Sequence, residues 1–296
     1  MTAVAPARAF LNLVKIEHSV FALPFAYLAT LTAMTVDGGR LRWRVLLLVT
    51  VAMVGARTFA MAANRIIDRH IDARNPRTAG RELVTGVVSV RTAWIGALVA
   101  LAVFLGAAAL LNPLCLALSP LAVLPLIGYP YAKRFTNWPH AILALAQLVG
   151  PVGAWLAVTG TVRGSFPAWV LGAAVGLWIG GFDLIYATQD VEVDRQIGVH
   201  SVPARYGVRF ALFASSLVHL VTFALFVWFG VLVGLGGWWW TGLVLAAAAF
   251  VYEHAIVRPA DLSRVNRAFF TANGFVGIAL FVFALVDLVL RSGLRA

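Results

Sequence analysis

Long apolar stretches recur along the chain and are separated mostly by short polar connections. A helix needs about 20 mostly apolar residues to cross a bilayer, and nine stretches come near that length. They run at about 18–36, 45–66, 92–111, 113–132, 138–160, 166–187, 208–233, 237–257 and 268–290. Backbone polar groups in hydrocarbon must be paired within the segment, and the alternation typical of a barrel is absent, so we expect nine transmembrane helices.

Composition supports the same conclusion. The 296 residues are 61% hydrophobic and only 12% charged, whereas soluble domains carry about 25% charged residues. The net charge of +11 would suit a nucleic-acid binder, but the apolar content excludes nucleic acid as a partner. We therefore expect an all-α membrane protein whose surroundings are the lipid bilayer.

Basic residues are distributed unequally between the two sides of the predicted bundle. With the N-terminus in the cytoplasm, 16 Lys and Arg fall in cytoplasmic segments and 6 in external ones, and Arg57 lies inside a helix. Cytoplasmic loops are enriched in basic residues, so we expect this orientation, with the long connections at about 67–91 and 188–207 in the cytoplasm. The first residues lack a small-residue cleavage pattern, so we expect no removable signal peptide.

Scarce acidic residues are concentrated at the ends of two predicted membrane helices on that side. The first group follows a four-residue interval on one helix face, and the second falls within about 40° on a helix. The groups are Asn64, Asp68 and Asp72, and Asp183, Asp190 and Asp194. Two aspartates of each group repeat at an offset of 122 residues, which favours an internal repeat of roughly 1–135 and 136–257.

One such group alone is most simply a solvated helix end whose acids are balanced by nearby arginines. Two groups on one side favour a shared site, because clustered carboxylates repel each other unless a cation neutralises them. Mg²⁺ prefers one or two carboxylates together with water and substrate phosphate oxygens. The pattern therefore predicts a site that holds a metal-bound diphosphate between acidic and basic side chains.

The motifs N-x-x-x-D-x-x-x-D from Asn64 and D-x-x-Y-x-x-x-D-x-x-x-D from Asp183 resemble those of the UbiA superfamily of intramembrane prenyltransferases. Their order and the nine stretches agree, and the resemblance covers essentially the whole chain as one domain, 1–296. NRIIDRHIDARNPRTAGREL and the earlier FALPFAY are most similar to the bacterial 4-hydroxybenzoate polyprenyltransferase-like branch. One residue departs from the family pattern: Arg65 stands where the family usually has an aspartate.

The resemblance implies a multi-pass protein of the bacterial inner (plasma) membrane, with nine helices around a central cavity and two Asp-rich cytoplasmic loops. It implies a Mg²⁺-dependent polyprenyl transfer that serves respiratory quinone biosynthesis. A polyprenyl diphosphate ionises to an allylic cation, and the ring of an aromatic carboxylic acid attacks that cation and then loses a proton.

The same resemblance assigns roles to individual residues. The metal would be held by Asn64, Asp68, Asp72, Asp183, Asp190 and Asp194. Among these, the catalytic aspartates would be Asp68, Asp72, Asp190 and Asp194. The diphosphate would bind Arg81, Tyr129, Lys133 and Arg69, and the acceptor would bind Arg57 and Tyr186.

Some of these residues also have simpler interpretations. Tyr129 and Lys133 suit an interfacial tyrosine with a lysine that reaches toward water, and Arg69 could pair with a nearby aspartate. Arg57 lies seven residues before Asn64, about 20° from its face and about 10 Å deeper in the membrane. A charge there costs at least about 2.5 kcal/mol unless it faces a polar cavity. Arg57 would thus bind the acceptor carboxylate or form an ion pair with Glu17.

The remaining polar residues carry no functional expectation. Arg74 and Arg77 are interpreted as loop charges. The histidines, which we expect to be structural or interfacial because they lack metal-ligand spacing, are His18, His70, His140, His200, His219 and His254. Glu253 and His254 indicate no function.

Other functions compete with this one. Within the class, the acceptor could be 1,4-dihydroxy-6-naphthoate of a menaquinone route, haem, a chlorophyllide or a lipid glycerol headgroup. A polytopic transporter would usually place its acids near the bilayer midplane, whereas here they lie at helix ends. A soluble all-helical prenyl synthase also has two Asp-rich motifs, but the hydropathy excludes it.

The charge asymmetry makes a prediction about topology. Cysteines introduced in the connections that hold Arg81 and His200 should not react with an impermeant thiol reagent applied outside intact cells. A cysteine near Arg163 should react, because that connection is expected outside. Labelling of either long connection, with no labelling near Arg163, would reverse the orientation.

Overall fold

The structure is a computed structural model that describes residues 6–14 and 23–291. Within these residues all the named secondary-structure elements are helices, and Arg258 and Asp261 form an isolated β-bridge. The first helices are α1 Pro6–Val14, α2 Leu23–Val36, α3 Trp43–Asp72, α4 Val90–Leu111, α5 Pro113–Ala132 and α6 Pro139–Thr159. They are followed by α7 Phe166–Tyr186, η2 Ala187–Asp190, α8 Val191–Ile197, α9 Val202–Tyr206, α10 Val208–Leu232, α11 Gly237–Ile256, α12 Val265–Arg267, the π-helical η3 Ala268–Ala272 and α13 Asn273–Arg291.

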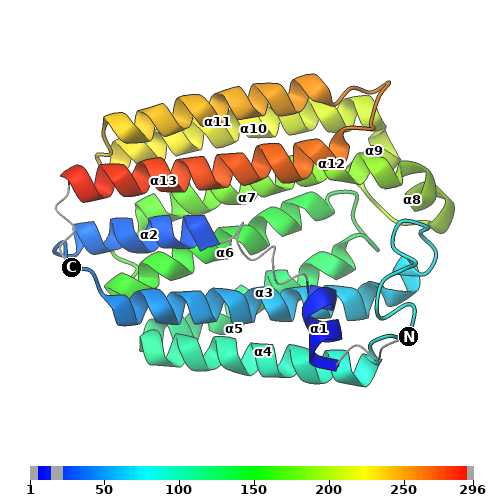
Figure 1. Cartoon of the computed structure of the whole chain (residues 1–296), viewed down its shortest axis with the longest axis horizontal. Helices are drawn as coiled ribbons and strands as arrows, with labels where there is room; N and C mark the ends of the chain where they lie inside the picture. Colours follow the sequence, from blue (N-terminus) through cyan, green and yellow to red (C-terminus); the bar gives the residue numbers. More distant parts are fainter. Residues whose placement is uncertain (1–5, 15–22, 292–296) are drawn as a thin grey trace.

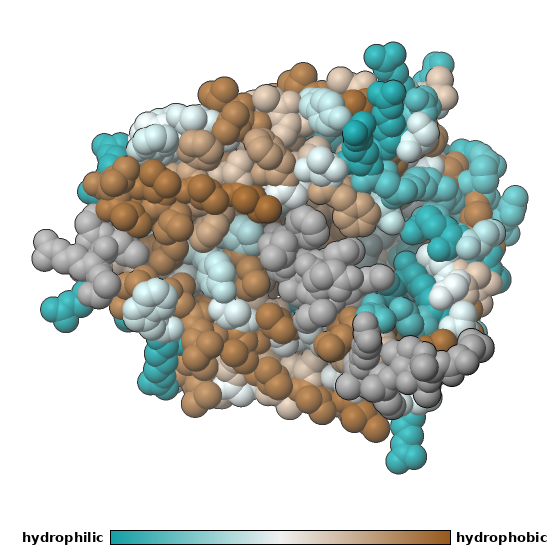
Figure 2. Space-filling model, viewed as in Figure 1, coloured by the Kyte–Doolittle hydropathy of each residue, from teal (hydrophilic) through white to brown (hydrophobic). Residues whose placement is uncertain are grey.

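The long helices run side by side, and the two long connections lie at the same end of the bundle (Figure 1). Helices α10 and α11 form one edge of this view, and α3, α4 and α5 form the other. Figure 2 shows hydrophobic residues along the flanks and hydrophilic residues gathered at the end with the long connections. On this face the flanks are therefore apolar and the end with the long connections is polar.

The predicted number of nine spanning helices is not confirmed. Helices occupy all nine predicted places within the described residues, but only seven are both long and apolar enough to cross a membrane. Helix α2 is described only from Leu23, and residues 15–22 lie outside the described ranges. Helix α11 has 20 residues, but tryptophans at its start and Glu253 and His254 near its end lower its hydropathy. Seven such helices still make this an integral membrane protein.

Helix starts follow from capping residues and prolines. Asn112 caps α5 by accepting a hydrogen bond from the backbone N–H of Cys115 at 2.9 Å, and Pro113 occupies the first turn. Ser89 caps α4 in the same way, and Pro139 begins α6. A proline in the first turn removes only an N–H that has no partner within the helix. The helix starts are therefore encoded locally.

Glycines at four-residue intervals on α7, namely Gly172, Gly176 and Gly180, face the backbone of α6. A Cβ added at Gly176 would lie 2.3 Å from the carbonyl oxygen of Ala144. The corresponding distances to α6 carbonyls are 2.8 Å for Gly172 and 3.1 Å for Gly180. Small residues at this spacing let membrane helices approach closely. The backbones of α6 and α7 are thus in direct contact, which fixes how their polar ends lie together.

Large aromatic side chains fill the centre of the bundle between α2, α7 and α10. The ring centroids of Phe25 and Trp178 are 5.2 Å apart in an edge-on arrangement, and those of Phe25 and Phe226 are 5.7 Å apart and stacked. All three side chains are almost completely buried. This packing holds α7 at a fixed depth beside its neighbours.

The glycine contacts make a prediction about stability. The substitution Gly176→Ala should force α6 and α7 apart and destabilise the protein by about 1–3 kcal/mol, the usual cost of overpacking. Gly153→Ala on α6 is the matched control, because a Cβ at that position meets no atom within 4 Å. Thermal unfolding in detergent should show a lower midpoint for Gly176→Ala only. Equal midpoints for the two variants would contradict the backbone contact.

Candidate functional site

A polar cavity of about 190 Å³ lies at the end of the bundle where the long connections meet. Its walls come from the ends of α3, α5 and α7, the start of α6, and both long connections. It is lined by all six residues of the two predicted acidic groups, which are Asn64, Asp68, Asp72, Asp183, Asp190 and Asp194. Helix α3 continues six residues beyond its predicted end to Asp72, so the first group is helical throughout.

Asp68 on α3 is buried and meets two basic residues that follow α5. Its Oδ2 atom lies 2.5 Å from Lys133 Nζ, and its Oδ1 atom lies 3.1 Å from Arg134 Nη1. The side-chain amide of Asn64 donates to Oδ2 at 3.4 Å. A buried carboxylate is stable only with such partners, so Asp68 links α3 to the end of α5.

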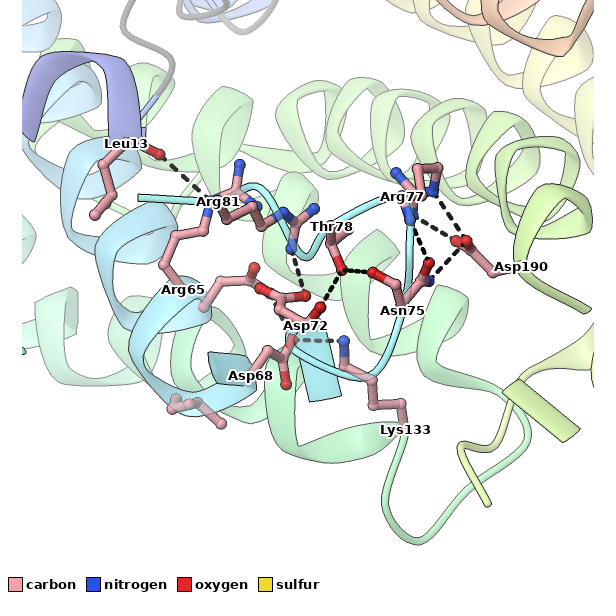
Figure 3. A network of polar contacts seen from close by, with 12 residues as sticks. Leu13, Arg65, Asp68, Asp72, Asn75, Arg77, Thr78, Arg81, Lys133 and Asp190 are labelled. Carbon is pink, nitrogen blue, oxygen red and sulfur yellow. Dashed lines mark hydrogen bonds and ion pairs between the residues drawn. The ribbon is translucent and has the colours of Figure 1, made fainter. Parts of the chain in front are cut away.

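Asp72, one turn further along α3, is paired with the connection that follows it. Arg81 Nη1 lies 2.6 Å from Asp72 Oδ1. The hydroxyl of Thr78 donates to the backbone carbonyl of Asp72 at 2.9 Å. These two contacts fold the connection back over the end of α3, as Figure 3 shows.

Asn75 and Arg77, in the turn of the same connection, contact Asp190. Arg77 forms a bidentate ion pair with it through one edge of the guanidinium, at 2.9 Å from Nε to Oδ1 and 2.5 Å from Nη2 to Oδ2. The amide of Asn75 donates to Oδ1 at 2.9 Å, and Arg77 Nη1 donates to the Tyr186 hydroxyl at 3.1 Å. The connection after α3 thus bridges the two acidic groups directly (Figure 3).

The environment of Arg77 raises the pKa of its guanidinium. Burial lowers the pKa of the Arg77 guanidinium, but the hydrogen bond to Asp190 and the charge of Asp190 outweigh that effect. The pKa of Arg77 therefore lies above its ordinary value, and the residue is a permanent cation at the cavity wall.

The other two acids have neighbours from different segments. Asp183 Oδ2 lies 2.7 Å from Nδ1 of His140, at the start of α6. Asp194 is buried and accepts a hydrogen bond from the Ser201 hydroxyl at 3.0 Å. The backbone N–H of His200 donates to the carbonyl of Lys133 at 2.8 Å, which ties the second connection to the end of α5.

The cavity combines groups for a cation with groups for an anion. Carboxylate and amide oxygens are the hard donors that Mg²⁺ accepts, and the cation needs few of them when it also binds phosphate. Arg77, Arg81 and Lys133 line the same space and supply positive charge. The donor set therefore fits a divalent metal ion together with a polyanion such as a diphosphate.

Not every predicted residue lies in the cavity. Tyr129, Lys133, Arg81 and Tyr186 line it together with the acids. Arg69 does not line it, and its Nη2 atom lies 3.3 Å from Nε2 of His70.

Arg57 and Arg65 of α3 also lie outside the cavity lining. Arg57 is half-buried, seven residues before Asn64 and deeper in the bundle. Its alternative partner Glu17 lies outside the described residues. Arg65 is buried and its Nε donates to the carbonyl of Leu13 at 3.4 Å, so the residue that departs from the family pattern faces α1 (Figure 3).

Several polar residues at the site were missed from the sequence. Asn75, Arg77, His140 and Ser201 line the cavity, and Arg134 pairs with Asp68. A local signal existed for Arg77, since the side chain of Asn75 accepts a hydrogen bond from the Arg77 N–H at 2.9 Å. Such turns are typical of asparagine, and the Asn-Pro pair indicates one. His140 had no comparable signal.

Comparisons with known proteins show which proteins this chain is similar to. Residues 22–275 match the UbiA prenyltransferase family. The 4-hydroxybenzoate octaprenyltransferase of Pseudomonas aeruginosa strain UCBPP-PA14 is 35% identical over 83% of this chain and 82% of its own length. The enzyme of the same name from Xanthomonas campestris pv. campestris strain B100 is 36% identical over 79% of this chain and 77% of its own length.

Two solved structures share the fold. An apo structure of a UbiA homolog from Aeropyrum pernix K1 has a TM-score of 0.84 at 36% identity, over 92% of this chain and 98% of that chain. A UbiA homolog from Archaeoglobus fulgidus bound to DMAPP and Mg²⁺ has a TM-score of 0.71 at 19% identity, over 95% of this chain and 99% of that chain.

The position of Arg77 makes a prediction about anion binding. Arg77→Gln should weaken the binding of inorganic diphosphate in the presence of Mg²⁺ by about tenfold, or about 1.4 kcal/mol, because a charged fork is lost from the cavity. Arg74→Gln removes the same charge from the same connection at an exposed position and is the matched control. Isothermal titration calorimetry measures both. Equal losses in the two variants would show that only overall charge matters.

Proposed function

Because this chain belongs to the UbiA prenyltransferase family, we propose that it transfers a polyprenyl group from a polyprenyl diphosphate to an aromatic carboxylic acid of the 4-hydroxybenzoate type. The observation that carries this proposal is the meeting of both acidic groups with three cations in one cavity at the end of membrane helices. The similarity to two enzymes named 4-hydroxybenzoate octaprenyltransferase supports the acceptor class. Respiratory quinone biosynthesis is the process that such a product serves.

The aspartates hold the metal in this proposal. Asn64, Asp68 and Asp72 form one set of oxygen donors, and the second set is Asp183, Asp190 and Asp194. Bound Mg²⁺ supplies Lewis-acid stabilisation of the negative charge that develops on the departing diphosphate. Lys133, Arg77 and Arg81 bind the phosphate oxygens. The hydroxyl of Tyr129, which lines the same cavity, can donate a hydrogen bond to them.

When the substrate binds, the aspartates and their basic partners would exchange one another for the metal and the diphosphate, and the balance of charge in the cavity would be kept. In the structure Asp68, Asp72 and Asp190 are each paired with a base. A metal-bound diphosphate brings positive charge to the carboxylates and negative charge to the bases. Each buried group keeps an opposite charge throughout, so the cavity avoids the cost of an unpaired buried ion. Release of diphosphate restores the original pairs.

The acceptor is positioned deeper in the bundle. Arg57 lies about 10 Å below Asn64 along α3 and about 20° from its face. A ring held between them would offer its carbon to the allylic cation while its carboxylate pairs with the guanidinium, which is a strong interaction where water is scarce. Tyr186, whose ring lies beneath the Arg77 guanidinium at 5.2 Å, forms part of the wall.

The cellular setting belongs to the same proposal. The cavity opens toward the cytoplasm of a bacterium, the chain spans the plasma membrane several times, and the prenyl donor enters from the bilayer. The positive-inside distribution of basic residues supports that orientation. The naphthoate acceptor of a menaquinone route fits the same chemistry and is the competing substrate.

One assay tests the substrate pair. Purified protein is incubated with Mg²⁺, a labelled polyprenyl diphosphate and a panel of acceptors, and products are identified by mass. The panel contains 4-hydroxybenzoate, 1,4-dihydroxy-6-naphthoate and phenols without a carboxylate. Preferential prenylation of 4-hydroxybenzoate supports the proposal. Preferential prenylation of the naphthoate would make the naphthoate the acceptor instead. Absence of turnover with either acid would refute the proposed function.

The two acidic groups should both be required. Asp68→Asn and Asp190→Asn should each lower kcat by at least about a hundredfold, equivalent to about 2.7 kcal/mol, because each removes a charged oxygen donor from the metal. Glu192→Gln is the control, since that carboxylate is exposed beside the second group. EDTA should abolish turnover and Mg²⁺ should restore it. Near-normal activity in either aspartate variant, in monodisperse protein, would refute the shared metal site.

Arg57 should act on the acceptor alone. Arg57→Ala should raise the KM for 4-hydroxybenzoate at least about tenfold and leave the KM for the diphosphate within about twofold, because it removes about 1.4 kcal/mol or more of binding on one side only. Arg57→Lys should restore only part of the loss, because lysine is a point charge without a fork. Unchanged acceptor kinetics in folded Arg57→Ala would leave this residue with a structural role.

A further inference from the structure

Three titratable side chains meet between membrane helices outside the acid-lined cavity. They are His219 of α10 and Glu253 and His254 of α11, and their ligand atoms lie within 4.8 Å of one another. His219 Nδ1 is 3.0 Å from His254 Nε2 and 3.6 Å from Glu253 Oε2. These residues lack metal-ligand spacing in the sequence, but a short turn pairs α10 with α11 and brings them together in space.

Glu253 presents an unsatisfied oxygen to this cluster. The side chain is 1% exposed, and its Oε1 atom accepts a hydrogen bond from Asn273 Nδ2 at 2.9 Å. Within the described part of the chain, no hydrogen-bond donor reaches Oε2. A buried carboxylate oxygen without a donor is costly, so the position requires a cation or a proton.

His219 directs a lone pair at the same point. Its Nε2 atom lies 3.2 Å from the carbonyl oxygen of Trp178, which can only accept a hydrogen bond. Nε2 therefore carries the hydrogen, and Nδ1, which faces Glu253 and His254, carries the lone pair. The ring is 2% exposed, and a Cβ at Gly181 would lie 2.5 Å from it, so the ring is held firmly in place.

His254 also directs a ring-nitrogen lone pair toward the other two side chains. Its Nδ1 atom lies 3.1 Å from the Ser216 hydroxyl, whose single hydrogen is donated to the carbonyl of Leu212 at 3.0 Å. Ser216 can then only accept from His254, so Nδ1 carries the hydrogen and Nε2 the lone pair. Two nitrogen lone pairs and a carboxylate oxygen thus lie within 4.8 Å of one another.

We propose that His219, Glu253 and His254 bind a divalent transition-metal ion of the zinc class. Ligand atoms around a tetrahedral ion with bonds of about 2.0–2.1 Å are about 3.3 Å apart. His219 Nδ1 lies 3.0 Å from His254 Nε2 and 3.6 Å from Glu253 Oε2, close to that value, and all three ligand atoms lie within 4.8 Å of one another. Two imidazoles and a carboxylate favour Zn²⁺ over Mg²⁺. Three protein ligands leave one position for water.

The surroundings of the cluster support metal binding. Imidazoles that bind metal usually donate their other ring N–H to a carbonyl, carboxylate or water, and the ligating carboxylate is itself hydrogen-bonded. Trp178 Nε1 donates to Asn273 Oδ1 at 2.7 Å, which turns the amide N–H of Asn273 toward Glu253. The bound ion joins α10 to α11, and these supports extend the connection to α7 and α13.

Direct binding measurements test this site without using prenyl transfer. Protein purified without a polyhistidine tag is stripped with EDTA and titrated with Zn²⁺ in excess Mg²⁺, which occupies the oxygen-lined cavity. We expect one tightly bound zinc per chain. His254→Ala and Glu253→Gln should each weaken zinc binding at least about tenfold, as loss of even a supporting contact does. His70→Ala, which removes an exposed imidazole, is the control and should leave zinc affinity unchanged.

Cobalt binding by the unmodified protein gives a second measurement that needs no variant. Co²⁺ in a four-coordinate site with two imidazoles should give strong visible absorption, whereas Co²⁺ in the oxygen-lined cavity should absorb weakly. Absence of that absorption, absence of stoichiometric zinc, or unchanged zinc affinity in both folded variants overturns the proposal. In those cases Glu253 holds a proton instead. A failed prenyl-transfer assay has no bearing on these readouts.

Discussion

Buried carboxylates need opposite charge, and this need organises the polar end of the bundle. The buried Asp68 is paired with bases that follow α5, and the partly buried Asp190 is paired with Arg77 from the connection after α3. Each pair joins segments that are distant in the sequence, so the charges hold the connections over the cavity. Removing one partner of a buried pair costs about 3–5 kcal/mol. In the proposed reaction the same pairs open for a metal-bound diphosphate, so fold stability and substrate binding would depend on one set of contacts.

Helix α7 sets the geometry for both polar clusters. Its glycines bring it into backbone contact with α6, which places Asp183 against His140 at the cavity. On another face, Gly181 leaves room for the ring of His219, and the Ser215 hydroxyl donates to the carbonyl of Gly181 at 2.6 Å. Without side chains at these glycine positions, neighbouring helices approach closely enough for polar groups to pair in a medium that contains no water.

The sequence predicted the features that depend on helical periodicity. The residues of the first acidic group share a face because four residues complete about one turn, and that holds in any fold that keeps α3 helical. Arg77 could not be placed in the same way, because its partner Asp190 lies 113 residues away. His219 and His254 are 35 residues apart, and only the pairing of α10 with α11 unites them. The count of nine spans is not confirmed, and at α11 tryptophans and the polar residues Glu253 and His254 lower the hydropathy.

Glu253 and His254 make α11 less favourable in the membrane, and the proposed ion site gives a reason for keeping them there. Trp178, whose carbonyl supports His219, precedes Asp183 by five residues on α7, or about 7–8 Å along the helix. One helix therefore supports an oxygen-lined cavity at its end and a nitrogen-containing cluster deeper in the bundle. Oxygen donors favour Mg²⁺, and imidazoles favour zinc. If both proposals hold, separation of the two donor types would let each cluster select its own cation, so an ion that fixes α10 to α11 would stay in place when a metal at the oxygen-lined cavity leaves with diphosphate.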